Sequence, residues 1–165
     1  MDDDIDVLTA ELIQFRRIEA FLIREAALLD DGRLGAWVDL FAEDGFYWAP
    51  ADPSQQSPFE RKSLLHEDRD GLRRRFCVDA PAAAIRSSRA VSNIAIEAAN
   101  AKLGAYEISA RFVMVQSRPG ESQRFYAGRY DYGLLRSGDG GGSIAAKKAT
   151  LLDATGIESP LAAPF

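Results

Sequence analysis

The hydrophobic pattern changes its period once along the chain, and this change limits the available folds more than any other feature. Over roughly the first half of the 165 residues, apolar side chains recur at the three- and four-residue spacing of helices. After Pro81, apolar and polar side chains alternate, as in strands with one buried face. Helices followed by strands predict an α+β fold with the helices on one face of a largely antiparallel sheet. The length suits one domain, which we expect to span residues 1–165.

The first predicted helix, over residues 5–31, is unusually long for a chain of this size. Acidic residues crowd its N-terminal end, where they complement the helix dipole. At 1.5 Å per residue it would extend about 40 Å, so it either bends or lies across a whole sheet. Its apolar side chains form one stripe. They are Leu8, Leu12, Phe15, Leu22, Ala26 and Leu29.

Short elements are predicted between this helix and the strand-rich half. Turn dipeptides, prolines and capping residues set their boundaries. They are a helix over 34–41, a turn at 44–45, a strand over 46–48, an irregular loop over 51–59, and a short helix near 66–76 capped by Asp68 or Asp70.

Four long strands are predicted in the second half, at 89–98, 106–115, 125–135 and 143–153. Turn residues at 118–121 and 138–142 connect the last three as hairpins. Gly128 and Gly133 lie inside a strand, where they indicate bulges or sharp curvature. We therefore expect a strongly curved, mostly antiparallel sheet wrapped around the long helix, a cone-shaped roll with an apolar interior.

The scarcity of two residue types excludes whole classes of site. The chain has one cysteine, Cys77, and one histidine, His66. Zinc, iron–sulfur and facial-triad iron sites each need several Cys or His ligands, so we expect no metal and no cofactor in this chain. An internal disulfide is impossible.

Charge and hydropathy limit partners and location. The formal net charge of −5 argues against a nucleic-acid partner, which would favour a basic surface. No apolar run approaches the ~20 residues of a membrane span, and the acidic N-terminal residues do not resemble a signal peptide. We expect a cytoplasmic protein with no membrane partner.

Cofactor-free acid–base chemistry remains possible inside a cone of this kind. It needs a carboxylate, a His or Tyr, and an apolar cavity that shifts their pKa values. Each available group also has a purely structural explanation as a turn residue, a helix cap or a core tyrosine. The candidates are Asp44, Tyr47, His66, Asp68, Tyr106, Tyr126 and Tyr130.

A polar cluster begins the strand over 89–98. Arg86, Arg89 and Asn93 precede apolar residues of that strand. The cluster is either a solvated strand end or an anchor between subunits, since arginine is favoured where it can hydrogen-bond across an interface. The pattern favours neither interpretation.

Several segments, taken in their order, resemble one known family. They are residues 25–33, 37–50, 66–75, 86–94, 125–131 and 147–153. Together they are similar to the small (beta) subunit of aromatic-ring-hydroxylating dioxygenases, over about residues 16–155. No single segment is diagnostic, and Arg89 stands where the family's pattern has a histidine.

The resemblance implies a nuclear-transport-factor-like cone, related in fold to ketosteroid isomerase and scytalone dehydratase. It also implies a non-catalytic structural subunit in the catabolism of aromatic compounds. A homotrimer of this subunit would support large catalytic subunits that carry a Rieske iron–sulfur cluster and a mononuclear iron. A reductase and often a ferredoxin would supply electrons.

Two alternatives stay open at this stage. One is a cofactor-free isomerase or dehydratase that uses the acid–base candidates named above. The other is a small-molecule binding protein of the same fold without chemistry of its own. Both require an open interior, whereas the structural subunit does not.

Overall fold

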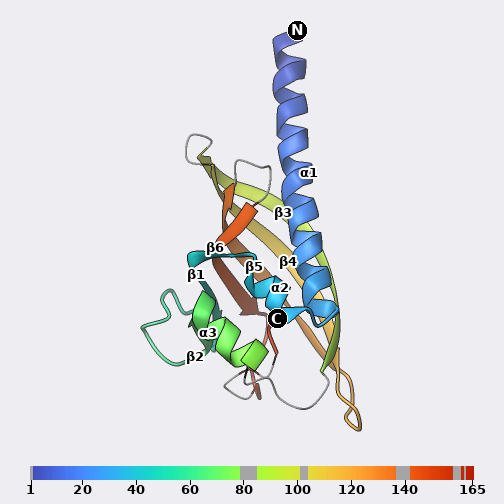
Figure 1. The fold of residues 1–165 in the computed structure, drawn as a ribbon, viewed down its shortest axis with the longest axis vertical. Helices are drawn as coiled ribbons and strands as arrows, with labels where there is room; N and C mark the ends of the chain where they lie inside the picture. The colour runs from blue at the N-terminus through green and yellow to red at the C-terminus, as the bar shows by residue number, and fades with distance from the viewer. Residues whose placement is uncertain (1, 79–84, 101–103, 137–141, 158–160, 162) are drawn as a thin grey trace.

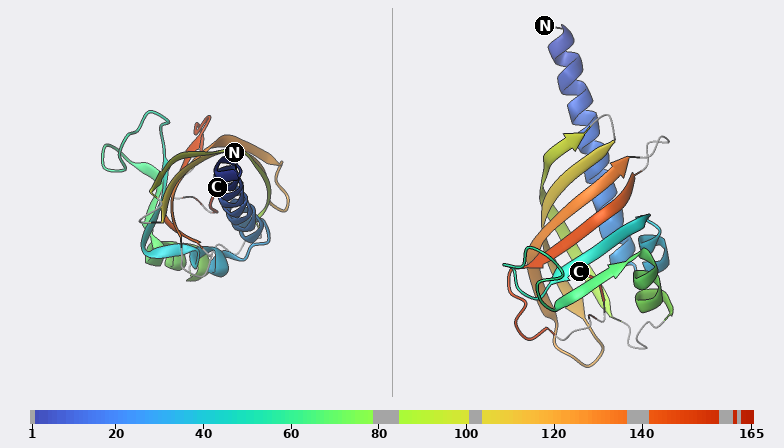
Figure 2. Two further views of the ribbon diagram at one scale, coloured as in Figure 1. Left: turned by 90° about the horizontal axis from the view of Figure 1, so that it is seen from above. Right: turned by 90° about the vertical axis from the view of Figure 1, so that its left-hand side faces the viewer.

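A strongly curved six-stranded sheet wraps around one long helix (Figures 1 and 2). The computed structural model describes residues 2–78, 85–100, 104–136, 142–157, 161 and 163–165. The helices are α1 (Asp2–Asp30), α2 (Leu34–Val38), α3 (Arg69–Arg73) and a π-helical turn over Arg74–Val78. The strands are β1 (Phe41–Pro50), β2 (Ser63–Asp68), β3 (Arg86–Asn100), β4 (Ala105–Ser117), β5 (Arg124–Arg136) and β6 (Gly142–Leu151).

The strands are ordered β2-β1-β6-β5-β4-β3. Strands β3 to β6 form an antiparallel meander, β1 adds to β6 in parallel, and β2 pairs antiparallel with β1. The predicted α+β class, the mostly antiparallel sheet and the meander are confirmed. Of the two predicted hairpin turns, the one at 118–121 is present. The other falls largely on 137–141, outside the described residues.

Helix α1 lies inside the curve of the sheet and projects beyond one end of it (Figure 2). Its last turns are packed: Leu22 is fully buried and Leu29 is 5% exposed. Its first turns are not, since Leu8 and Leu12 are about 60% exposed. The predicted apolar stripe exists, but only its C-terminal half meets the sheet.

The region between α1 and β3 differs most from the sequence-based expectation. Phe41 begins a strand rather than ending a helix, and the predicted turn at 44–45 lies within β1, where the pairing with β6 shifts register. His66 was expected at the start of a helix and lies in β2, an unpredicted strand. Asp68 does cap α3, where its Oδ1 accepts a hydrogen bond from the Gly71 amide at 2.7 Å.

The two strand glycines serve different purposes. A register shift between β5 and β6 follows Gly133, so the predicted irregularity is there. The β5 pairing is regular at Gly128, where a side chain is excluded by crowding. A Cβ at this position would lie 2.9 Å from the Phe112 ring and closer still to the Thr150 carbonyl oxygen. Gly128 therefore permits close packing rather than a bulge.

Candidate functional site

A buried ion pair occupies the centre of the cone. Glu25 of α1 and Lys147 of β6 approach to 2.6 Å, and their side chains are 2% and 0% exposed. The Trp37 indole N–H donates to the same carboxylate at 3.0 Å, and the Tyr132 hydroxyl donates at 2.7 Å. Both carboxylate oxygens thus have partners. Removing one member of such a pair leaves a buried charge and typically costs about 3–5 kcal/mol.

The surroundings decide the protonation states of this cluster. Burial would raise the pKa of Glu25, but the charge of Lys147 and three hydrogen bonds hold that pKa below its ordinary value. Glu25 is therefore ionised at neutral pH. Burial also raises the pKa of the Tyr47 and Tyr132 hydroxyls, so both remain protonated. Glu25 is paired with Lys147, and the two tyrosines keep their protons. None of these groups is therefore free to act as a base.

The interior next to this pair is filled by the chain itself. The Tyr47 hydroxyl donates to the Phe165 backbone oxygen and accepts from the Phe165 amide, each at 3.2 Å. Lys147 Nζ donates to the same backbone oxygen at 3.3 Å and lies 4.3 Å from the centre of the Tyr130 ring. Leu161 and Phe165 are 6% and 2% exposed. Residues distant in sequence thus close the space that a substrate would need.

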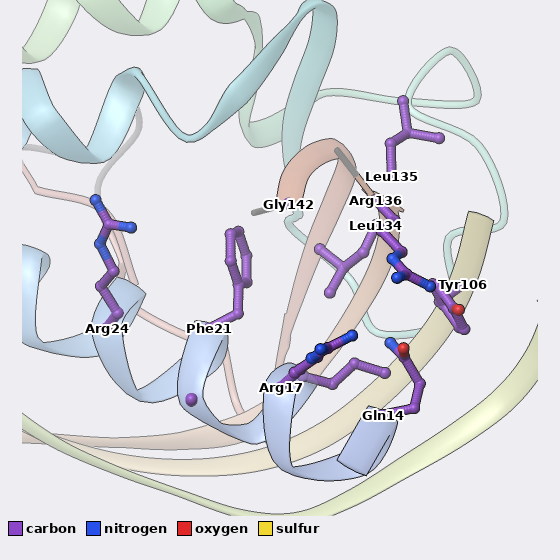
Figure 3. A pocket seen from close by; sticks show the side chains of 11 residues that line it. Gln14, Arg17, Phe21, Arg24, Tyr106, Leu134, Leu135, Arg136 and Gly142 are labelled. Atoms are coloured by element: carbon purple, nitrogen blue, oxygen red, sulfur yellow. The ribbon is translucent and has the colours of Figure 1, made fainter. Parts of the chain in front are cut away.

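A separate pocket of about 230 Å³ lies between α1 and the ends of β4 to β6 (Figure 3). Phe21, Tyr106 and Leu134 give it apolar walls. Arg24 lies on one side of Phe21, and Arg17 and Arg136 on the other. We call this site the arginine-rimmed pocket, defined by these six residues.

Two further observations concern metals and membranes. Within the described part of the chain, no group of three or more His, Cys, Asp or Glu side chains is arranged to hold a metal ion. In the same residues, no helix combines the length and the apolar character needed to cross a membrane.

Comparison with known proteins places this architecture in one family. The family model for the ring hydroxylating beta subunit matches residues 24–158. The beta subunit of biphenyl 2,3-dioxygenase from Rhodococcus jostii RHA1 is 30% identical over 156 residues, covering 86% of this chain and 83% of the relative. The chain belongs to the ring-hydroxylating dioxygenase β subunits. The family resemblance read from the sequence is confirmed.

One solved structure supports this assignment, and a more distant one shares the fold. The β subunit of benzoate 1,2-dioxygenase from Burkholderia mallei is 26% identical, with a TM-score of 0.68 over 86% of this chain and 92% of that one. A Novosphingobium aromaticivorans protein with the provisional name scytalone dehydratase is 15% identical, with a TM-score of 0.71 over 96% and 99% of the two chains. This β subunit therefore has the scytalone dehydratase-like cone that the resemblance implied.

The acid–base candidates of the β subunit are divided between its interior and its surface. Tyr47 and Tyr130 lie in the centre, and Tyr126 packs against Phe165 with 5.2 Å between ring centres. Tyr106 is buried in the wall of the arginine-rimmed pocket. The three non-tyrosine candidates, Asp44, His66 and Asp68, are exposed. The imidazole and the candidate carboxylates are thus outside, away from the buried tyrosines.

Three of the most important central residues were not predicted. Glu25 lies within the apolar stripe, three residues after Leu22 and four before Leu29. Lys147 shares the inward phase of Ala149 and Leu151 in β6. Opposite charges at two inward positions are the signal that could have paired them. The role of Phe165 had no local signal, because it depends on a contact with Tyr47.

The polar cluster of β3 proves partly internal. The Arg89 side chain is 2% exposed, and its Nε donates to Asp30 at 2.8 Å. The Arg89 amide and the Ser87 hydroxyl donate to the same carboxylate, at 2.8 and 2.9 Å. Arg89 thus links β3 to Asp30 at the end of α1. Arg86 and Asn93 are exposed, and for them an inter-subunit role stays a prediction.

Proposed function

We propose that this β subunit is the non-catalytic structural component of a Rieske-type aromatic-ring-hydroxylating dioxygenase. It would act in the cytoplasm, in the catabolism of aromatic compounds. Three copies would form a base for large subunits that carry the Rieske cluster and the mononuclear iron. A reductase and a ferredoxin would deliver electrons to the large subunits.

The family match over residues 24–158 is the observation that carries this proposal. The centre of the cone around Glu25 and Lys147 is occupied by side chains and by Phe165, which supports the non-catalytic part. The isomerase alternative needs an open interior with a tyrosine or histidine beside a free carboxylate. Tyr132 does contact a carboxylate, that of Glu25, but Lys147 pairs with that carboxylate and also donates a hydrogen bond to the Phe165 backbone oxygen. No described contact favours the alternative.

An apolar patch on the outer face of the sheet supports self-association. Val113, Phe125 and Leu152 are 59%, 74% and 82% exposed. Val113 and Leu152 flank Ala127 on its two sides, and Phe125 is two residues before Ala127 on the same strand. Adjacent apolar side chains at this exposure are typical of protein–protein contacts. We call Val113, Phe125 and Leu152 the outer patch.

Charges beside the outer patch point to a second copy of the chain as its occupant. Arg129 contacts Asp131 at 2.7 Å and Glu97 at 3.5 Å on this face. In a cyclic trimer this face would contact a different face of the next copy. A face that carries both signs permits that contact, whereas a strongly negative face would repel another copy of this acidic chain. Arginine beside apolar residues is also typical of interface composition.

The proposal is tested by native mass and by capture. Light scattering on the purified chain should give about three times 18.1 kDa. Co-expression with a Rieske-type large subunit encoded by a neighbouring gene should yield a stable complex when either chain is captured. A chain that is monomeric at micromolar concentration and captures no large subunit would overturn the proposal, as would turnover of a substrate by this chain alone.

A matched pair of variants tests the surface. Phe125→Asp should reduce the native mass towards that of one chain, because it buries a charge in the apolar contact. Phe59→Asp makes the same change at a residue that is 86% exposed and outside the outer patch, and it should leave the mass unchanged. Equal masses for the two variants would show that the outer patch is not the contact.

A further inference from the structure

The arginine-rimmed pocket gathers positive side chains in an acidic protein, and these side chains lack described ion-pair partners. The net charge is −5, yet three arginines surround one cavity. None of Arg17, Arg24 and Arg136 forms an ion pair with a described residue, whereas Arg16, next to Arg17 on α1, pairs with Glu19 at 2.6 Å. Three cationic side chains around one cavity, without described counterions, make its electrostatic potential positive, which favours a bound anion.

We propose that the arginine-rimmed pocket binds a small organic anion, namely a carboxylate attached to a single aromatic or similarly sized apolar ring. The ring would lie against Phe21, Tyr106 and Leu134, and the carboxylate would accept hydrogen bonds from the guanidinium groups at the rim. This site is separate from the ion pair at the centre of the cone, and it does not depend on the proposed function.

The chemistry of the walls selects this ligand class. Phe21 and Tyr106 present aromatic surfaces, and Leu134, only 6% exposed, closes the apolar wall. Guanidinium groups match carboxylates because their N–H donors form a planar fork. A ligand with only the ring would leave the arginines unpaired, and a ligand with only the carboxylate would leave the apolar wall exposed to water. Both halves are needed for affinity.

The size of the pocket limits the ligand to one ring. Pockets that hold drug-sized molecules typically have volumes of about 300–1,000 Å³, and this one has about 230 Å³. A ligand of about ten non-hydrogen atoms binds with modest free energy, so we expect a dissociation constant of roughly 0.1–5 mM. The volume accepts one ring-sized group and does not accommodate a longer segment of a partner.

The test uses phenylacetate as the probe, titrated into the purified full-length chain and followed by calorimetry. Two ligands separate the halves of the interaction. Phenylacetamide keeps the ring and the shape without the charge, and acetate keeps the charge without the ring. Each should bind at least about tenfold more weakly than phenylacetate.

Two triple variants locate the site. Arg17→Gln, Arg24→Gln and Arg136→Gln together should weaken phenylacetate binding by at least about tenfold, since each exposed guanidinium contributes roughly two- to fivefold. Arg16→Gln, Arg33→Gln and Arg61→Gln together remove the same charge from exposed positions outside the pocket. That control should change binding by less than about twofold.

Four results would overturn the proposal. They are no binding of phenylacetate up to about 20 mM, equal binding of phenylacetate and phenylacetamide, equal binding by the wild type and the pocket variant, and an equal loss in the control variant. Loss of large-subunit capture by the pocket variant, without any binding of phenylacetate, would instead assign the pocket to an acidic side chain of a partner. Circular dichroism checks that both variants fold.

Discussion

The two halves of α1 carry the same apolar stripe but meet different surroundings. In the C-terminal half, Leu22 and Leu29 are buried under the sheet, and Glu25 forms the central ion pair. In the N-terminal half, Leu8 and Leu12 are about 60% exposed, and the helix projects beyond the strands (Figure 1). One continuous helix thus has one half that holds the fold together and another half that the fold does not use.

The contrast between the two halves limits what an amphipathic pattern predicts about a helix. An apolar stripe shows that a helix has a face to bury, but it does not show what covers that face. The sheet covers the C-terminal half of the stripe. The projecting half leaves a row of large apolar side chains in solvent, a pattern typical of surfaces that bind another protein. In an assembly subunit, this half is available for contacts between chains.

The largest effect should come from the ion pair at the buried half. Lys147→Met removes the charge that Glu25 faces and leaves the carboxylate buried. We expect a loss of about 3–5 kcal/mol in the free energy of unfolding, measured by urea denaturation. A loss below ~1 kcal/mol would mean that the pair is not structurally important, and the comparison of the two halves would fail.

A matched leucine pair compares the halves directly. Leu22→Ala should cost about 2–5 kcal/mol, because Leu22 is fully buried and its truncation leaves a cavity. Leu12→Ala makes the same change at a residue that is 60% exposed, and it should change stability by less than ~0.5 kcal/mol. Both are measured by urea denaturation. Equal costs would show that the projecting half packs against its own chain.

The anchor at the end of α1 should give a smaller effect. Asp30→Ala removes the acceptor of three hydrogen bonds. It also leaves the Arg89 side chain, which is only 2% exposed, without its ion-pair partner. We expect a cost of roughly 2–3 kcal/mol in thermal or urea unfolding. Asp31→Ala, at the neighbouring exposed residue, is the control and should cost almost nothing. A similar cost for both variants would contradict the assigned anchor.

Acid should weaken the buried half by a smaller and graded amount. The folded-state pKa of Glu25 is lowered from 4.5, so its ionised form contributes stability above that value. The contribution is lost as the pH falls through the folded-state pKa. The difference in unfolding free energy between the wild type and Glu25→Gln should therefore be constant from about pH 7 to 5 and shrink below about pH 4.5. A difference that grows on acidification would contradict this prediction, because it would mean that folding raises the pKa of Glu25.

Most of the fold could be predicted from the sequence because its periodic segments are long. The alternation in β4 places Tyr106, Ile108 and Phe112 inward, and all three are buried. The region from Phe41 to His66 could not be predicted. Strands β1 and β2 pair with each other, and β1 also pairs with the distant β6. The aromatic run from Phe46 to Trp48 was too short to predict the length of β1 or the presence of β2.

The central cluster was harder to predict than the family. Tyr47 and Tyr130 were selected as acid–base candidates, and both lie in the cone as packed side chains whose hydroxyl pKa values are raised by burial. Glu25 and Lys147 are separated by 122 residues, and only the closed cone brings them together. Local pattern identifies inward positions, whereas the contact between two such positions depends on the register of the whole sheet.

The most direct test of the structural role is the turnover of the assembled oxygenase when candidate groups of this chain are replaced. Tyr47→Phe, Tyr130→Phe and His66→Gln are combined, and kcat is measured per mole of complex with the aromatic substrate of its large subunit. We expect kcat to stay within about twofold of the wild type, since none of these groups takes part in the reaction. A fall of about 100-fold or more, with the amount of complex unchanged, would contradict it.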